Sequence, residues 1–242
     1  IEVLATQNKE NELFDLTYLL SIGTDNDPRM KVAVDYIEYL GTEEFTAEQL
    51  KKELYKLGCE YSVFASADRT YVTLSGLDEN MEPALELFES LLNEPKEDQE
   101  ALSNYVNRLL RSRADSKKDK GTILWSGLYN YARYGAQNSF TNTLSNTALQ
   151  ELDPQELLEL VKQIPTLEHR VLYYGPRKAS DVKQVLEQYH RTPEQLSPLP
   201  EIVEVAKRHN ARILIDEAHS TFVFGENGRG VAEHFGLDDE ID

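Results

Sequence analysis

Residues 59–77 carry the pattern that constrains the fold most. The run CEYSVFASADRTYVTLSGL alternates apolar and polar side chains on both sides of Ala67-Asp68. Such alternation is typical of a β-hairpin with one buried face, because successive side chains of a strand point to opposite sides of the sheet. The segment therefore predicts two antiparallel strands in a sheet that is covered on one side.

Helices are expected before and after this hairpin. Met30 to Leu40 places apolar side chains at helical spacing. Thr46 and Gln49 form a capping box at the start of a second helix, and Gly58 can end it in the left-handed conformation. After the hairpin, one apolar stripe indicates a third helix that ends at Pro95: Ala84, Leu85, Phe88, Leu91 and Leu92.

The rest of the first 190 residues completes an α+β pattern. Strands are predicted at residues 12–23 and 169–177, and helices over most of 96–135 and over 180–190. The charged run Arg113 to Gly121 is the best internal candidate for a mobile loop. Asp153, Pro154 and Glu156 begin a short helix with a cap, a first-turn proline and an early acid. The order of elements predicts a mainly antiparallel sheet packed against helices.

The pattern changes at residues 191–200, where three prolines favour an extended connector. Beyond it, a helix at 201–210, a buried strand ARILID and a short helix VAEHFG form one βα unit of a parallel α/β fold. We therefore expect three parts: a domain over 1–190, a connector over 191–200 and a fragment of a second fold over 201–242.

Charge and composition limit the classes of partner. The chain carries 43 acidic and 25 basic side chains, a net charge of -18, which repels nucleic acids and anionic membranes. The single Cys59 excludes an internal disulfide, and no apolar run is long enough to span a bilayer. We expect a soluble protein with neither nucleic acid nor membrane as a partner, in the cytoplasm or a periplasm, which the sequence does not distinguish.

The first part of the chain resembles the insulinase/pitrilysin family of zinc metallopeptidases. The resemblance rests on the helix leading to Gly41-Thr42, the TAEQL helix, the hairpin and the helix after it. It continues through YARYGAQNSFTNTLSNTALQELDPQELLELVKQIP to LYYGPR, so it covers about four fifths of the chain. It implies a peptidase-like domain over residues 1–190.

The zinc motif of that family is missing here. Active members carry His-x-x-Glu-His on the helix before the Gly-Thr pair, because two imidazoles one turn apart hold Zn²⁺ while the glutamate acts on its water. Those places fall at about Val32, Asp35 and Tyr36, and the first histidine of the chain is His169. The segment therefore resembles the family's non-catalytic half, which builds the wall of the substrate chamber opposite the zinc half. We assign no catalytic residue and no metal ligand.

Other polar and aromatic residues of this part are expected to be structural. Asp35 and Glu38 fit a solvated helix face better than a relic of a catalytic site. One aromatic set is expected to pack in the core and on the sheet rather than grip a peptide: Tyr36, Tyr39, Tyr55, Tyr61, Phe64 and Tyr71.

The last forty residues contain the letters DEAH, Asp216 to His219. A DEAH-box helicase would also need a phosphate cradle with a Gly-Lys pair, and the sequence has no such pair. The longer run LPEIVEVAKRHNARILIDEAHSTFVFGENGRGVAEHFGL instead resembles the pyridoxal-phosphate enzymes of the α-oxoamine synthase family, most nearly serine palmitoyltransferase. In that family the residue at Asp216 pairs with the pyridine nitrogen, and the residue at His219 hydrogen-bonds the ring's phenolic oxygen.

This second resemblance implies a cofactor site that is incomplete. The family's Schiff-base lysine lies in a downstream Thr-x-Ser-Lys segment, and none follows His219 in these 242 residues. The residues that stack on the ring and hold its phosphate precede the motif in the family, where a peptidase-like domain stands here. We therefore expect Asp216 and His219 to be polar groups at a strand end, with no cofactor bound.

The two resemblances meet near residues 197–201, so the chain is interpreted as a fusion. The leading hypothesis is a non-catalytic, chamber-forming metallopeptidase domain, not an enzyme by itself, whose partners are a separate catalytic half and a peptide substrate. One alternative is a fragment of a pyridoxal-phosphate-dependent acyltransferase. Another is a ligand-free, self-associating domain, in which a second copy covers the apolar strand Ala211 to Asp216.

Overall fold

The computed structural model describes residues 1–138, 140–193 and 196. The chain divides into two units, residues 1–199 and 200–242, and all described residues belong to the first. Its strands are β1 (Glu2–Gln7), β2 (Leu13–Leu20), β3 (Cys59–Ala65), β4 (Thr70–Leu77) and β5 (Arg170–Gly175). Its longer helices are α1 (Met30–Tyr36), α2 (Ala47–Lys56), α3 (Met81–Asn93), α4 (Gln99–Ser116), α7 (Pro154–Gln163) and α8 (Ala179–Tyr189). The shorter helices are η1 (Ile37–Tyr39), η2 (Asp78–Asn80), the π-helix η3 (Thr122–Leu128), α5 (Tyr129–Tyr134), α6 (Asn146–Gln150) and η4 (Ile164–Thr166).

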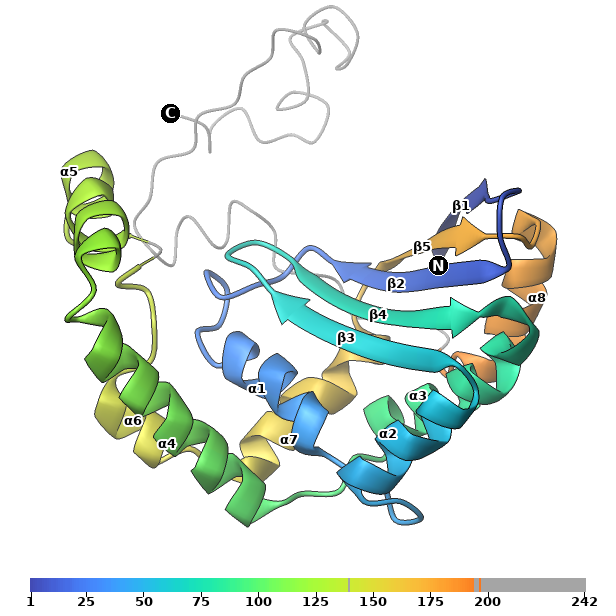
Figure 1. Ribbon diagram of the computed structural model, residues 1–242, viewed down its shortest axis with the longest axis horizontal. Helices are drawn as coiled ribbons and strands as arrows, with labels where there is room; N and C mark the ends of the chain where they lie inside the picture. The colour runs from blue at the N-terminus through green and yellow to red at the C-terminus, as the bar shows by residue number, and fades with distance from the viewer. Residues whose placement is uncertain (139, 194–195, 197–242) are drawn as a thin grey trace, which may run out of the picture. The chain divides into compact units, whose positions relative to one another are not determined.

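The five strands form one sheet in the order β1-β5-β2-β4-β3. The pairs β2–β4, β2–β5 and β3–β4 are antiparallel, and β1–β5 is parallel. Helices α1, α2, α3, α7 and α8 lie along one face of this sheet (Figure 1). The predicted fold class, α+β with a mainly antiparallel sheet packed against helices, is therefore confirmed for the described unit.

The core lies between the sheet and these helices. On the central strand β2, alternate side chains are buried and point toward the helices, among them Leu16, Tyr18 and Leu20. From the helix side, α3 presents the predicted apolar stripe, in which Phe88 and its neighbours are fully buried. Burial of this apolar surface is the main favourable term in the stability of the unit.

The predicted helix ends are confirmed in detail. Thr46 Oγ1 accepts from Gln49 N at 3.3 Å, and Gln49 Oε1 accepts from Thr46 N at 2.9 Å, which completes the capping box of α2. Gly58 follows that helix with φ +63°, where a residue with a Cβ is strained. Asp153 caps α7 by accepting from Gln155 N at 2.9 Å.

The charged run Arg113 to Gly121 is not a loop, and that expectation was wrong. Helix α4 continues to Ser116, and helical structure resumes at residue 120, so the interruption covers three residues. Two contacts explain the continuity. Arg113 Nη1 donates to the Leu144 carbonyl at 2.7 Å, and the Asp119 carboxylate accepts from Thr122 N at 2.7 Å at the start of the next helical stretch.

The aromatic set was only partly assigned correctly. Tyr36 is fully buried, as expected, but Tyr55 is 82% exposed and Phe64 is 55% exposed. Tyr55 lies on the outer side of α2. Phe64 projects from the side of the sheet that faces away from the helices, together with its cross-strand partner Tyr71.

Among the described residues, no helix combines the length and apolar character that a membrane-spanning segment needs.

Two of the expected parts fall wholly or mostly outside the described residues. These are the βα unit over 201–242, with Asp216 and His219, and most of the connector over 191–200.

Candidate functional site

Helix α1 places two of the three positions of the zinc motif in the interior of the unit. Val32 is 3% exposed and Tyr36 is 0% exposed, so both side chains belong to the core. Asp35 lies between them on the sequence and is a quarter exposed. The two places where imidazole ligands would be needed are therefore occupied by side chains that pack against apolar neighbours.

Tyr36 and Asp35 instead connect α1 to α4. The Tyr36 hydroxyl donates to the Asp98 carbonyl at 2.7 Å and accepts from Asp98 N at 2.9 Å, and burial raises the pKa of this phenol. The Tyr105 hydroxyl donates to Asp35 Oδ2 at 2.6 Å, and burial, followed by this hydrogen bond and the Asp35 charge, raises the pKa of Tyr105.

Asp35 also forms an ion pair with Lys31 at 3.0 Å. Lys31 lies on the same helix, whereas the Tyr105 hydrogen bond ties this carboxylate to α4, so Asp35 is only partly solvated and the expected solvated face is found here in part. Glu38 meets that expectation, because its side chain is half exposed and lies 4.0 Å from Lys51 at the surface.

The described residues contain no cluster of three or more His, Cys, Asp or Glu side chains arranged to hold a metal ion. The sequence-predicted site residues Asp216 and His219 lie outside the described residues, so their assignment stays a prediction. The described part of the chain therefore offers two other features that bear on function: a buried polar cluster and an exposed face of the sheet.

The buried polar cluster joins four side chains from distant parts of the chain. His169 Nε2 lies 2.9 Å from His190 Nε2, and His190 Nδ1 lies 2.7 Å from Glu89 Oε1. The Tyr18 hydroxyl donates to the same Glu89 oxygen at 2.6 Å. His169 Nδ1 lies 2.6 Å from the Leu167 carbonyl. Each of the four titratable residues is less than 10% exposed.

One hydrogen bond of this cluster assigns a proton. A carbonyl only accepts, so His169 Nδ1 carries a proton and donates it to Leu167. Between the two Nε2 atoms one ring donates and the other accepts. The two imidazoles are therefore linked to each other and to Glu89 in one continuous chain of hydrogen bonds.

Burial shifts the pKa values of two side chains in this cluster, His169 and Tyr18. Burial lowers the pKa of His169, with a smaller contribution from the neighbouring His190 ring. Burial also raises the pKa of Tyr18 well above its ordinary value, and the Glu89 charge acts in the same direction. With its hydrogen bonds satisfied internally and little exposure to solvent, the cluster serves structure rather than substrate chemistry.

The second feature is the face of the sheet that points away from the helices, which we call the uncovered face. Its side chains alternate with the buried ones along every strand, and the register brings them into rows. The apolar and aromatic members are Leu4, Leu13, Leu19, Phe64, Tyr71, Leu77, Leu172 and Tyr174. An ordinary solvated sheet face carries polar side chains at these places, so this composition indicates a surface that another molecule or domain covers.

Polar residues surround and divide this apolar surface. Thr17 and Thr73 share a hydrogen bond of 2.8 Å at its centre, and Thr17 is only 6% exposed. The acidic members are Glu2, Asp15 and Glu60, and the single cation, Arg170, is paired with Glu2 at 2.6 Å. The uncovered face is therefore apolar with an excess of negative charge.

Comparison with known proteins matches the two parts of the chain to different families. The family model described as Insulinase (Peptidase family M16) matches residues 34–147, and Aminotransferase class I and II matches residues 195–242. Each part of the chain therefore resembles a different family. The residues that match the first model run from the end of α1 into α6 and include α2, β3, β4, α3 and α4, and those that match the second begin in the connector.

Solved structures confirm the peptidase-like fold of the first part. A peptidase M16 inactive domain from Pseudomonas fluorescens superposes with a TM-score of 0.66 at 17% identity, over 81% of this chain and 50% of that one. The periplasmic protease PqqL from Escherichia coli gives a TM-score of 0.63 at 12% identity, over 79% of this chain and 22% of that one. At these identities the likeness establishes the fold alone.

The curated relatives match the end of the chain. The 8-amino-7-oxononanoate synthase of Petrotoga mobilis is 53% identical over 47 residues, and the serine palmitoyltransferase of Bacteroides ovatus is 55% identical over 47 residues. Each match covers 19% of this chain and 12% of the relative. The predicted resemblance to a serine palmitoyltransferase is confirmed, and the chain spans only a small part of these relatives.

The buried cluster and the uncovered face were both missed at the level of sequence. The cluster gave no local signal, because its members lie in four elements. The uncovered face did give a local signal. Phe64 follows Glu60 and Ser62 at two-residue spacing, so an aromatic side chain lies on the polar side of a predicted strand.

Proposed function

We propose that residues 1–190 form a non-catalytic, chamber-forming domain of a zinc metallopeptidase of the insulinase/pitrilysin family. The observation that carries this proposal is the burial of Val32 and Tyr36 at the places of the zinc-binding imidazoles. The Pseudomonas fluorescens structure with the same fold is itself described as an inactive domain, which supports the proposal.

In this role the domain needs a catalytic half that supplies zinc and the activated water. Its own contribution is surface against which a peptide or another domain can pack. The same fold occurs in a ferredoxin protease whose structure holds Arabidopsis ferredoxin, at 17% identity and a TM-score of 0.66, which is consistent with a protein substrate.

The test compares metal content, hydrolysis and binding in the purified chain. A reduced and alkylated protein with a fluorescent label serves as the unfolded probe. We expect no stoichiometric zinc after dialysis against zinc, no new fragments of the probe, and a saturable rise in its fluorescence anisotropy. Zinc bound one to one with hydrolysis, both abolished by Asp35→Ala but not by the exposed control Glu38→Ala, would overturn the proposal. So would a probe that neither binds nor is cleaved.

A second candidate concerns residues 201–242, where 8-amino-7-oxononanoate synthases and a serine palmitoyltransferase match. The alternative function is that of a pyridoxal-phosphate-dependent acyltransferase fragment, with Asp216 on the pyridine nitrogen and His219 on the phenolic oxygen. The cofactor would supply an electron sink. We propose instead that these two residues hold no cofactor. Titration with pyridoxal phosphate should leave the same spectrum for the wild-type chain and for Asp216→Asn, and a saturable band lost in Asp216→Asn would favour the alternative.

We also propose that the two parts meet in the connector over 191–200. Limited proteolysis tests this boundary, because a protease cuts extended linkers before it cuts packed domains. A stable fragment ending within 191–200, with the circular dichroism of a folded α+β domain, supports it. First cuts within α8 or β5 would contradict it.

A further inference from the structure

The four side chains of the buried polar cluster are not anchored equally. Tyr18 lies within β2 on the central strand of the sheet, and Glu89 lies in the middle of α3. His169 directly precedes β5, and its Nδ1 atom is bonded to the Leu167 carbonyl. These three side chains belong to the packed body of the unit. His190 differs, because it follows the last residue of α8 as the C-terminal cap of that helix.

The last turn of α8 has few other contacts with the core. The helix lies beside α3 and β1 (Figure 1), where Val182 and Val185 bury the earlier part of its apolar face. In the last turn Leu186 is buried and Tyr189 is partly buried. The side chain of His190, which is 1% exposed, is therefore a main attachment of this turn. An end with so few apolar contacts can open while the rest of the unit stays folded.

The cluster can balance one positive charge and no more. Among the described residues, Glu89 is the one acid within hydrogen-bond distance of either imidazole. Tyr18 stays neutral, because burial holds the pKa of its hydroxyl well above the ordinary value. A second imidazolium would leave a buried charge without a counter-charge, which is costly.

The geometry opposes the second imidazolium as well. The Nε2 atoms of His169 and His190 lie 2.9 Å apart, and their hydrogen bond needs one of them to accept. If both rings carried protons on both nitrogens, two N–H groups would point at each other at this distance. The contact must then break, and His190 is the member that can move, since it lies at a helix end.

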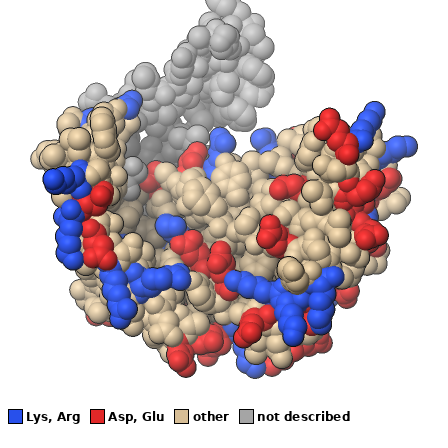
Figure 2. All heavy atoms as spheres, viewed as in Figure 1, with Lys and Arg blue, Asp and Glu red and all other residues tan. Residues whose placement is uncertain are grey.

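The other charged groups that flank the cluster are at the surface. They are the N-terminal amine of Ile1, Glu2, Glu94, Glu168, Arg170 and Arg191. Glu94 and Arg191 form a loose pair at 3.5 Å, and Glu2 pairs with Arg170. Figure 2 shows acidic and basic side chains interspersed over the side of the surface where α8, β1 and β5 lie. Solvent and salt screen such exposed charges, so the response of the cluster to pH comes mainly from its own groups.

We infer that the cluster is a pH-sensitive latch on the end of α8. At neutral pH the chain of hydrogen bonds holds His190 against α3. At acid pH the uptake of a second positive charge by the two rings expels His190 and frees the last turn of the helix. That turn leads directly into residues 191–200, so the latch controls whether the end of the unit at the connector is closed or open. This inference does not rest on the proposed peptidase role.

Hydrogen exchange on the whole chain tests the latch. Protection factors, which are corrected for the effect of pH on the intrinsic exchange rate, are compared at pH 7.5 and 5.0. Burial lowers the pKa of His169 in the closed state, whereas an opened imidazole has the ordinary value of about 6.5. Opening should therefore become easier below that pH, by up to about tenfold for each pH unit. We expect the last turn of α8 to lose protection at least about threefold.

The urea dependence of exchange separates local opening from global unfolding. Local opening exposes little surface, so at pH 5.0 exchange in the last turn of α8 should change little with low concentrations of urea. Exchange in β2 should accelerate with urea, because it needs global unfolding. Unchanged protection in the last turn at the two pH values would overturn the inference. So would a loss with the urea dependence of β2, since acid would then promote global unfolding alone.

Variants test whether the two rings cause the response. His169→Gln removes one of the facing rings, so protection in the last turn of α8 should be nearly equal at pH 7.5 and 5.0. His234→Gln removes a histidine outside the described residues and should respond as the wild type does. Circular dichroism confirms that each variant is folded. A response of His169→Gln as large as that of the wild type would overturn the inference.

The wild-type chain also provides a test without substitutions. In nuclear magnetic resonance spectra, imidazole signals of the two buried rings should titrate over the pH range in which the last turn of α8 opens. Titration of both rings over a separate range would contradict the latch.

Discussion

His190 and Glu89 are 101 residues apart in the chain, yet His190 Nδ1 lies 2.7 Å from Glu89 Oε1. The two side chains are 1% and 4% exposed. This contact joins the end of α8 to the middle of α3, and through His169 it reaches the start of β5. Removal of one partner from a buried pair leaves the other without a counterpart, which costs far more than the net stabilisation by the pair.

Substitution of Glu89 should therefore destabilise the unit strongly. Glu89→Ala removes the acceptor of both His190 and Tyr18, and we expect a loss of about 3–5 kcal/mol in the free energy of unfolding. Glu89→Gln keeps one oxygen acceptor and should cost about 1–3 kcal/mol. Urea titration followed by circular dichroism measures both. Glu86→Gln, an exposed change on the same helix, should have little effect, and equal stability of all three variants would contradict the prediction.

His169 should make the stability of the unit fall at acid pH. Burial lowers its pKa in the folded state, whereas the unfolded imidazole has the ordinary value of about 6.5. Below that pH the unfolded chain binds more protons, so stability falls as pH decreases, until the pH passes below the folded-state pKa.

The variant His169→Gln keeps an acceptor for His190 and removes the titrating ring. Other groups also titrate in this range, so the informative quantity is the difference between the two proteins. Between pH 7.5 and 5.5 the wild type should lose more stability than the variant, by up to about 1.4 kcal/mol for each pH unit. Parallel pH profiles would show that His169 is not responsible.

Tyr18 should make the stability of the unit fall at alkaline pH. Burial and the Glu89 charge raise its pKa, so above about pH 10 the unfolded phenol ionises while the folded one stays protonated. Its contribution to stability is complete below that pH and is lost as pH rises further. Tyr18→Phe should therefore flatten the alkaline decline while costing about 1–3 kcal/mol at neutral pH. Tyr174→Phe, at a half-exposed tyrosine, is the control, and a decline as steep as in wild type would refute the assignment.

Local signals explain what the sequence could predict. The capping box of Thr46 and Gln49, the left-handed Gly58 and the stripe around Phe88 depend on residues close together in the chain. The hairpin at residues 59–77 followed from alternation within each strand. Each of these features depends on residues within a few positions of one another, so it can be predicted from the sequence.

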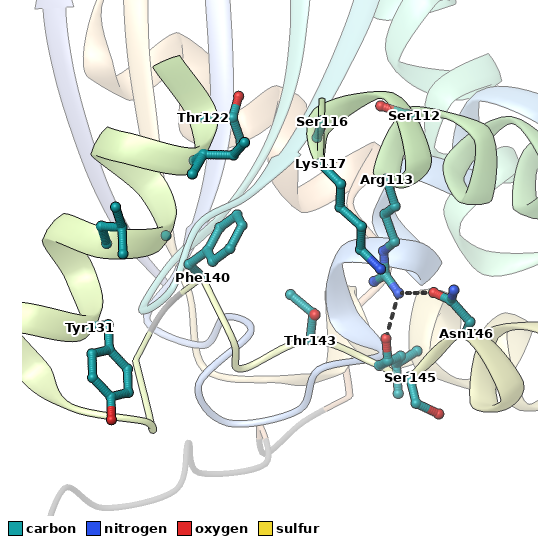
Figure 3. A pocket seen from close by; sticks show the side chains of 14 residues that line it. Ser112, Arg113, Ser116, Lys117, Thr122, Tyr131, Phe140, Thr143, Ser145 and Asn146 are labelled. Atoms are coloured by element: carbon teal, nitrogen blue, oxygen red, sulfur yellow. Dashed lines mark hydrogen bonds between the residues drawn. The ribbon is translucent and has the colours of Figure 1, made fainter. Parts of the chain in front are cut away.

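Long-range contacts explain which features could not be predicted from the sequence. Strand β1 pairs in parallel with β5 across 168 residues, from Glu2 to Arg170, and six residues with weak alternation did not identify it. The buried cluster needs Tyr18, Glu89 and two histidines from other elements to meet, which no spacing encodes. The charged run Arg113 to Gly121 was misjudged because charged residues mark loops on average, whereas here the bond from Arg113 to the Leu144 carbonyl holds the end of α4 in place (Figure 3).

Tyr36 should prove to be a structural tie rather than a relic of a catalytic helix. Its hydroxyl bonds both backbone groups of Asp98, the residue that caps α4, at 2.7 and 2.9 Å. Tyr36→Phe keeps the ring in the core but leaves these groups without their partner, at a cost of about 1–3 kcal/mol. Hydrogen exchange should accelerate in the first turn of α4, because the loss acts at its cap, and stay unchanged in α8. Tyr55→Phe, at an exposed ring, should alter neither. If exchange in α4 stays at the wild-type rate, the α1–α4 tie does not depend on this hydroxyl, and Asp35 with Tyr105 must hold the two helices together.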